Sequence, residues 1–95
     1  MPNFILLSRF EGDTRKDAAN LPGRLEAFAG ALAEDGITVV DQWLTLGHYE
    51  HVAVVEAPDS GKIVATLGKA ASIIETHTDV LAGFTLGDTK ALLTA

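Results

Sequence analysis

The stretch of the chain that most constrains its fold is residues 43–58, WLTLGHYEHVAVVEAP. It contains two apolar segments rich in β-branched and aromatic residues, which favour strands. Gly47 lies between the segments and is followed by a histidine, a pairing typical of a tight turn between antiparallel strands. Pro58 ends the second segment because proline cannot donate a ladder hydrogen bond. The stretch predicts a β-hairpin with strands at residues 37–46 and 49–57.

The remaining sequence predicts a strand and a helix on each side of this hairpin. Apolar residues recur at helical spacing from Leu21 to Leu32, and Gly36 follows where a helix often ends in a left-handed residue. The last nine residues, GDTKALLTA, predict a short tail or a single helical turn. The predicted elements are a strand at residues 3–9, a helix at 21–36, the hairpin, a helix capped by Asp59 or Ser60, and a strand at about 77–86.

This order of elements is the split βαβ pattern of a ferredoxin-like sandwich, an α+β fold. Ninety-five residues are enough for one hydrophobic core, so we expect a single domain over residues 1–95. The fold implies a four-stranded antiparallel sheet with two helices on one face. The other face needs a separate explanation, because a sheet face exposed to water is usually polar.

The strands are apolar on both faces. Phe4 and Leu6 alternate with Ile5 and Leu7 in the first strand, and residues 52–55 are all alanine or valine. We therefore expect a homo-oligomer, most simply a dimer that packs sheet on sheet. A monomer with an apolar exposed sheet is the alternative.

Composition excludes several classes of partner. Thirteen acidic and seven scattered basic residues give a net charge of -6, which disfavours binding to nucleic acid. No run approaches the roughly 18 apolar residues that span a membrane, and the opening MPNFILLSRF fits a strand better than a signal peptide. The absence of cysteine excludes disulfides and is compatible with the cytoplasm. We expect a soluble cytoplasmic protein.

The stretch WLTLGHYEHVAVVEAPD resembles the signature of the GYD domain family, small bacterial and archaeal proteins named for a glycine-tyrosine-aspartate motif. Gly47 and Tyr49 match that motif, and Glu50 stands where aspartate is usual. MPNFILLSRF, the helix at 21–36 and THTDVLAGFTL also resemble the family, so the likeness spans nearly the whole chain. The resemblance implies a ferredoxin-like fold and self-association of the dimeric α/β-barrel type. It implies no particular activity.

Four residues are candidates for acid–base chemistry. His77 and Asp79 are two apart on a predicted strand, so they share a face and could form a His-carboxylate pair. Tyr49 beside the turn could move a proton, and His51 lies on the following strand. Tyr49 has a structural alternative, in which its ring packs on the sheet, and His77 and Asp79 have another, an exposed polar patch at the start of the last strand.

Other residues are candidates for binding a ligand. Arg9 should lie near the last strand, where a guanidinium can hold an anion or form an intersubunit ion pair. Trp43 could line an aromatic pocket, although packing in the core or a dimer interface is the stronger expectation. His48 and Glu50 flank the turn. The histidine spacing does not converge on an ion, so we expect neither metal nor cofactor.

Two functions follow from these patterns, and the sequence does not decide whether the chain is a catalyst. The preferred one is an oligomeric module that binds a small molecule or assembles with itself. The alternative is a small cofactor-free enzyme, such as an isomerase, dehydratase or monooxygenase-like protein, acting on an apolar metabolite. A cavity between sheet and helices would place such an active site.

Overall fold

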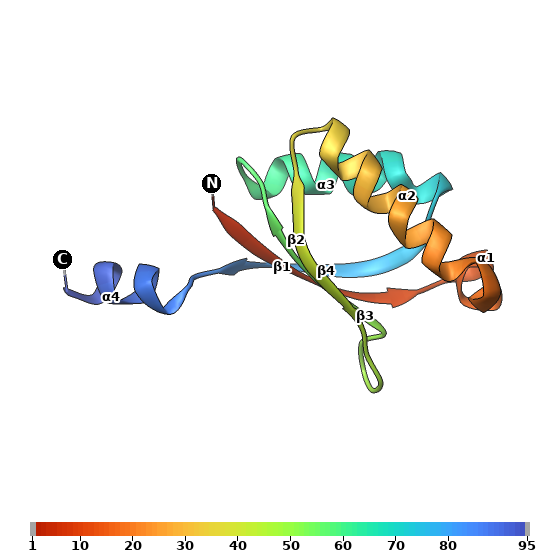
Figure 1. Ribbon diagram of the computed structural model, residues 1–95, viewed down its shortest axis with the longest axis horizontal. Coiled ribbons are helices and arrows are strands. Elements are labelled where there is room, and N and C mark those ends of the chain that lie inside the picture. The colour runs from red at the N-terminus through yellow and green to blue at the C-terminus, as the bar shows by residue number, and fades with distance from the viewer. Residues whose placement is uncertain (1, 95) are drawn as a thin grey trace.

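The computed structural model describes residues 2–94 and has the predicted order of four strands and two long helices (Figure 1). Two short helices, α1 and α4, and two 3₁₀ turns are added to that order. The elements are β1 (Asn3–Phe10), α1 (Gly12–Lys16), η1 (Ala18–Asn20), α2 (Leu21–Glu34), β2 (Thr38–Leu44), β3 (His51–Glu56), α3 (Ser60–Lys69), η2 (Ala70–Ser72), β4 (Thr76–Gly83) and α4 (Leu86–Thr94).

The four strands form one antiparallel sheet in the order β2-β3-β1-β4. Helices α2 and α3 lie side by side over one face of this sheet, and the opposite face carries no helix (Figure 1). The register between β2 and β3 shifts between Val39 and Asp41, so Val40 forms a bulge on the edge strand. The predicted ferredoxin-like sandwich is confirmed.

The core lies between the sheet and the two helices. Alternate residues of β1 and β3 point into it because successive side chains of a strand leave opposite faces. The core side chains include Phe4, Leu6 and Phe10 of β1, Ala53 and Val55 of β3, Leu25, Phe28 and Leu32 of α2, and Ile63 of α3. The intervening strand residues therefore face the side without helices.

We call that side the outer face. Its apolar residues are Ile5, Leu7, Val40, Trp43, Val52, Val54 and Leu81. They are all partly or largely exposed, and Trp43 retains 49 % of its accessible surface. The sheet is thus apolar on both sides, as the sequence predicts.

The ends of the two long helices form as predicted. After α2, Ile37 N donates to Leu32 O at 2.9 Å and Gly36 N donates to Ala33 O at 3.0 Å. These two bonds define a Schellman motif, and Gly36 takes the left-handed conformation that the motif requires, with φ of 79°. At the start of α3, Asp59 Oδ1 accepts a hydrogen bond from Lys62 N at 2.8 Å and caps the helix.

The predicted tight Gly-His turn is wrong. Strand β2 ends at Leu44 and β3 begins at His51, so a longer loop joins them. Thr45 Oγ1 donates to Tyr49 O at 2.7 Å, while Glu50 N donates to Ser8 O of β1 at 2.9 Å. Glu50 is bonded on both sides, since its carbonyl oxygen also accepts from Thr45 N at 2.9 Å, and the loop between these two residues spans positions 46–49.

The predicted end of the chain is also wrong. Strand β4 ends at Gly83 rather than near residue 86, and α4 is a nine-residue helix rather than a single turn. Asp88 N donates to Thr85 Oγ1 at 3.0 Å, and Thr85 N donates to Asp88 Oδ2 at 3.3 Å. This reciprocal capping box starts the helix. Among residues 2–94, no helix is long and apolar enough to cross a membrane.

Candidate functional site

Four polar residues meet at one end of the outer face, which we call the polar end. Arg9 of β1 lies opposite His77 of β4 in the sheet register. Asp79, two residues along β4, accepts a hydrogen bond from the Tyr49 hydroxyl at 2.7 Å. The structure therefore brings together Arg9, Tyr49, His77 and Asp79, of which the sequence predicts three as acid–base residues and Arg9 as a ligand-binding residue.

The Tyr49–Asp79 hydrogen bond decides what Tyr49 can do chemically. It raises the pKa of the Tyr49 phenol above its usual value, with partial burial and the charge of Asp79 adding to the effect and the charge of Arg9 opposing it. A phenol with a raised pKa stays protonated at neutral pH. Tyr49 is thus suited to donate a hydrogen bond and poorly suited to act as a base.

His51 lies on the opposite side of the sheet from Tyr49 and Asp79. Its side chain is only 2 % exposed, and its ring lies 6.1 Å from that of Phe10 and 6.4 Å from that of Phe28. The side-chain amide oxygen Oε1 of Gln42 is an acceptor, so the Nε2–H of His51 donates to it at 2.9 Å. Burial lowers the pKa of His51, which keeps the imidazole neutral.

The four predicted acid–base residues therefore do not form one site. A substrate in contact with Tyr49 and Asp79 on the outer face is separated by the sheet from His51. The layer around His51 is filled by apolar side chains such as Phe10 and Phe28. Among the described residues, His51 is the one titratable group that is buried there.

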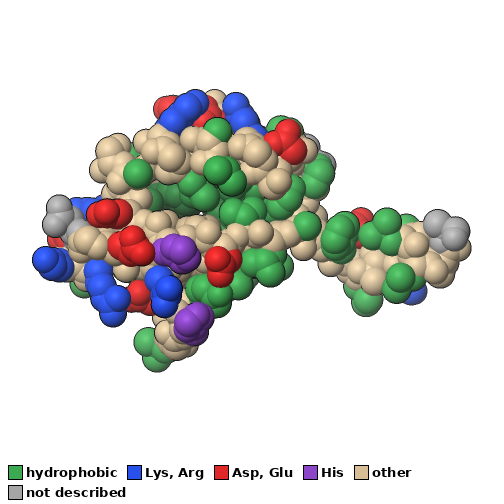
Figure 2. All heavy atoms as spheres, turned by 180° about the vertical axis from the view of Figure 1, so that it is seen from behind, with side chains coloured by type: hydrophobic (Ala, Val, Ile, Leu, Met, Phe, Trp, Pro, Cys, Tyr) green, Lys and Arg blue, Asp and Glu red, His purple; other side chains and the backbone are tan. Residues whose placement is uncertain are grey.

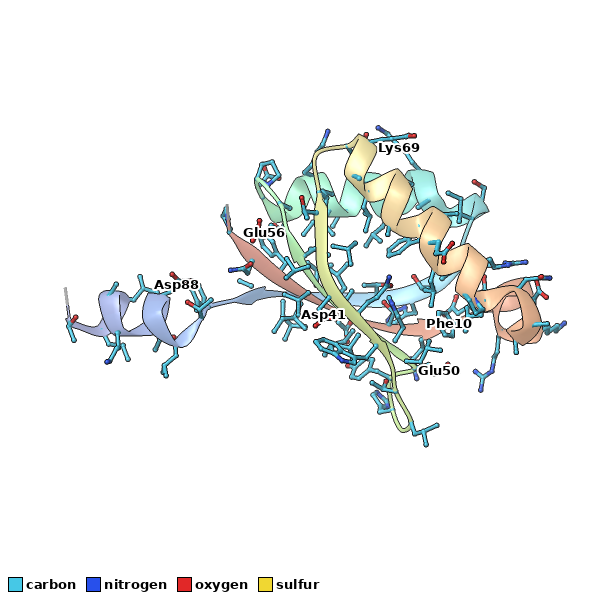
Figure 3. The ribbon with its side chains drawn as sticks, viewed as in Figure 1. Phe10, Asp41, Glu50, Glu56, Lys69 and Asp88 are labelled. Carbon is cyan, nitrogen blue, oxygen red and sulfur yellow. The ribbon has the colours of Figure 1, made fainter. Side chains whose placement is uncertain are left out.

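A second polar feature lies beside the loop between β2 and β3. It is a cleft of about 400 Å³, which we call the hairpin cleft, lined by Arg9, Arg15, Thr45, Leu46, Gly47, His48 and Glu50. Figure 3 places Glu50 at the base of the loop. Basic, acidic and histidine side chains gather at this end of the molecule (Figure 2). The His48 ring contacts the Tyr49 ring edge-on at 4.8 Å and so connects the cleft to the polar end.

Three of the four predicted ligand-binding residues line this cleft, namely Arg9, His48 and Glu50. Trp43 does not, because it lies on the outer face of β2 opposite Val52. The expectation that Trp43 packs in the core is wrong for the single chain, since half of its surface is exposed. Its place in a dimer interface stays a prediction.

Sequence reasoning missed Arg15 and Thr45 as lining residues of the cleft. Arg15 belongs to α1, which directly follows β1, and β1 ends beside the loop because it pairs with β3. The predicted strand order would have revealed this proximity, because it places the segment that follows the first strand next to the hairpin. The scattered spacing of the basic residues in the sequence hid this proximity.

The histidines are distributed over three places: His48 in the loop, His51 on the helix side of the sheet, and His77 on the outer face. Among the side chains that the structure describes, no group of three histidine, aspartate or glutamate residues is placed to hold a metal ion. The polar end and the hairpin cleft are suited instead to hydrogen bonding and to holding a charged group.

Known proteins resemble this chain over nearly its whole length. The GYD domain family matches residues 4–93. A curated relative from Thermus thermophilus, the "glutamine synthetase and cystathionine beta-lyase binding protein", is 33 % identical over 94 residues, which cover 98 % of this chain and 99 % of that protein. The crystal structure of TTHA0845, also from Thermus thermophilus, matches with a TM-score of 0.52 at 22 % identity, covering 90 % of this chain and 95 % of the other, and supports the fold. The chain therefore belongs to the GYD domain family.

Proposed function

We propose that this protein is a binding module that associates with itself through the outer face and with a metabolic enzyme through the hairpin end. The observation that carries the proposal is the apolar outer face. Val40, Trp43 and Leu81 are 54 %, 49 % and 43 % exposed there, in a row of strands that no helix covers. Exposed apolar patches of this kind mark protein–protein contacts.

The chemistry of the outer face suits a second copy of the chain. Its centre is aliphatic, with Ile5, Leu7 and Val54 partly exposed, and its aromatic residue is a tryptophan. Interfaces between identical chains have apolar centres, polar rims and aromatic anchors. The polar end, where Tyr49 binds Asp79, supplies one part of such a rim.

Self-association is tested by a charge placed on the outer face. Val54→Glu puts a carboxylate in the middle of this face, and Val64→Glu makes the same change on the exposed surface of α3. We expect light scattering to show a dimer for the wild type and for Val64→Glu, and a monomer for Val54→Glu. Circular dichroism checks that both variants are folded. A wild type that stays monomeric as its concentration is raised contradicts self-association.

The enzyme partner is proposed from the relative. That protein is named for binding glutamine synthetase and cystathionine β-lyase, and it aligns with nearly the whole of this chain. The same two enzymes, from the organism that makes this protein, are therefore the first partners to test. Nothing in the fold requires catalysis for this role, which agrees with the packed layer around His51.

The hairpin end is the surface proposed to contact the enzyme. The Leu46 side chain is fully exposed, and Leu44 and Leu46 border a hollow of about 260 Å³ that also contains Phe10 and Leu21. The hairpin cleft beside it carries Arg9. Arginine is enriched among the residues that dominate binding at interfaces, and the exposed leucines beside it add apolar area that a partner can bury.

Leu46→Ser tests this surface. We expect it to weaken binding of immobilised glutamine synthetase or cystathionine β-lyase by about tenfold or more, which corresponds to about 1.4 kcal/mol. Val64→Ser is the matched control, since it removes an exposed aliphatic side chain from α3. Equal binding by the wild type and Leu46→Ser would show that the hairpin end is not the surface that contacts the enzyme. No binding of either enzyme by the wild type would exclude these partners.

A small anionic ligand in the hairpin cleft is the second candidate function. It is favoured because the cleft carries two arginines and His48 against one carboxylate, Glu50, in a chain of net charge -6. Titration of inorganic phosphate or succinate, followed by nuclear magnetic resonance, tests it. Saturable shifts at Arg9 and Arg15 that vanish in Arg15→Gln but persist in Arg24→Gln support it, and uniformly non-saturating shifts exclude it.

A further inference from the structure

Helix α4 projects away from the rest of the molecule as an arm (Figure 1). None of its residues is buried, and Leu86 and Leu93 are 80 % and 81 % exposed. Apolar side chains are visible along this arm in Figure 2. The radius of gyration is 14.0 Å, compared with roughly 12.4 Å for a compact domain of this length. The arm makes the single chain more extended than its size requires.

The arm is nevertheless specified as a helix by its own sequence. Thr85 and Asp88 form the reciprocal capping box at its start, and Figure 3 shows Asp88 in its first turn. A nine-residue helix is not stable in water without packing, because its nucleation is costly and few bonds follow. Ala91 and Leu92 line a hollow of about 430 Å³ with Phe4 of their own chain, yet Leu86 and Leu93 stay largely exposed, so the capped helix needs a further apolar surface.

The accessible surface of the chain indicates how much area a partner could bury. It is 5843 Å², whereas a folded monomer of 10.0 kDa exposes about 5,200 Å². The excess of about 600 Å² approaches the roughly 800 Å² that each partner buries in a stable interface. The arm adds no charge barrier, since its Asp88 and Lys90 cancel within a chain of net charge -6. It can approach a second acidic chain without added repulsion.

A surface of matching character lies on the outer face, next to the start of the arm. It is a hollow of about 370 Å³, which we call the outer hollow, lined by Asn3, Ile5, Val40, Val54, Glu56, Gly83, Phe84 and Thr85. Phe84 belongs both to the hollow and to the segment that leads into α4. A two-fold axis near Phe84 would bring the arm of one copy to the outer hollow of the other, and symmetry would repeat the contact.

We infer that α4 is an arm exchanged between two copies of the chain, with the leucines of each arm covering the outer hollow of the other copy. The inference rests on the proposed self-association and adds to it a specific contact, between Leu92 and Leu93 of one chain and Ile5, Val40 and Val54 of its partner. Each arm then gains the packing that its helix needs. Each outer hollow is closed by residues from outside its own chain.

Isotope-filtered nuclear Overhauser measurements test this contact directly. A sample mixed from ¹³C-labelled and unlabelled full-length chains reports only contacts between copies. We expect intermolecular signals from the Leu92 and Leu93 methyls to the methyls of Ile5, Val40 and Val54. A dimer in which these leucines give only intramolecular signals, or none to the outer hollow, overturns the exchanged arm and leaves self-association standing. A monomer in the same sample overturns both.

Substitution on the arm supplies an independent measurement. Leu93→Ser removes an apolar contact, and Lys90→Ser is the matched control on the same helix. We expect Leu93→Ser to raise the dimer dissociation constant by about tenfold or more, and Lys90→Ser to change it by less than about threefold. Equal dissociation constants for the two variants would show that the arm does not contribute, and would overturn the inference even if the dimer persists.

Discussion

The hydroxyl of Tyr49 donates to the carboxylate of Asp79 at 2.7 Å across strand β1, which separates β3 from β4 in the sheet. Tyr49 lies in the loop just before β3, so its side chain ties the hairpin loop to the far edge strand. The bond therefore holds the hairpin cleft in a fixed relation to the polar end of the outer face.

Because Tyr49 is the only tyrosine in the chain, its ionisation can be followed by the ultraviolet absorbance of the phenolate. The pKa is raised by the hydrogen bond to Asp79 first, so we expect a midpoint above 10.0 in the wild type. Asp79→Ala should return the midpoint toward 10.0. A wild-type midpoint at or below 10.0 would show that the bond does not form in solution.

The pKa of His51 predicts how stability depends on pH. Burial lowers the folded-state pKa below 6.5, so the unfolded chain binds a proton that the folded chain resists. The stabilisation that comes from keeping His51 neutral is therefore fully present above about pH 6.5. It falls as the pH drops below that value, by at most about 1.4 kcal/mol per pH unit for this one group.

Urea unfolding across this pH range measures the effect. His51→Gln keeps a donor for Gln42 without a titratable ring, so its stability should decline less between neutral and mildly acidic pH. The hydrogen bonds from Thr66 and Lys69 lower the pKa of Asp35. The contribution of Asp35 to stability is therefore lost only below about pH 3.8, outside the range in which His51 is tested. Identical pH slopes for the wild type and His51→Gln would contradict a depressed His51 pKa.

Two glycines with free space around them should respond to alanine in opposite directions. Neither Gly36 nor Gly68 has an atom within 4 Å of an added Cβ, so sterics do not decide the outcome. Gly36 has a positive φ of 79°, and alanine there should cost about 1–2 kcal/mol. Gly68 lies inside α3, where alanine should add up to about 1 kcal/mol. Chemical denaturation measures both changes, and a Gly36→Ala variant as stable as the wild type or more stable would contradict the Schellman assignment.

Trp43, the only tryptophan, reports on the outer face. In one chain it is 49 % exposed, and burial by a second copy should shift its fluorescence to shorter wavelength and reduce quenching by acrylamide. Both changes should follow protein concentration in the wild type. They should be absent in Val54→Glu, which keeps Trp43 exposed. A spectrum independent of concentration while light scattering shows dimer formation would place the interface elsewhere.

Much of the fold was predictable because it depends on local patterns. The alternation in β1 and β3, the helical spacing from Leu21 and the caps at Gly36 and Asp59 are all readable from neighbouring residues. The error at the hairpin involves a contact with a residue far away in the sequence. The hairpin loop closes between Thr45 and Glu50, and Glu50 also donates to Ser8 O of β1, a contact that the sequence of the hairpin alone does not show.

The site shows the same division. The common face of His77 and Asp79 follows from strand periodicity, and their proximity to Arg9 follows from the predicted strand order. The bond from Tyr49 to Asp79 and the burial of His51 beside Phe28 could not be predicted, because both depend on how the loop and α2 pack on the sheet. The capping box of α4 is recognisable in the sequence from Thr85 and Asp88, so the start of this helix was predictable.

The bulge at Val40 has a consequence for how the protein can aggregate. Edge strands offer unpaired backbone groups that can template the addition of further strands, and a bulge disrupts that template by twisting the edge and breaking its regular spacing. Strand β2 is such an edge, and Asp41 next to the bulge adds a charge to it. Growth along the sheet, which has no natural end, is thereby discouraged on this side, whereas the proposed contact through the apolar face would close after two copies.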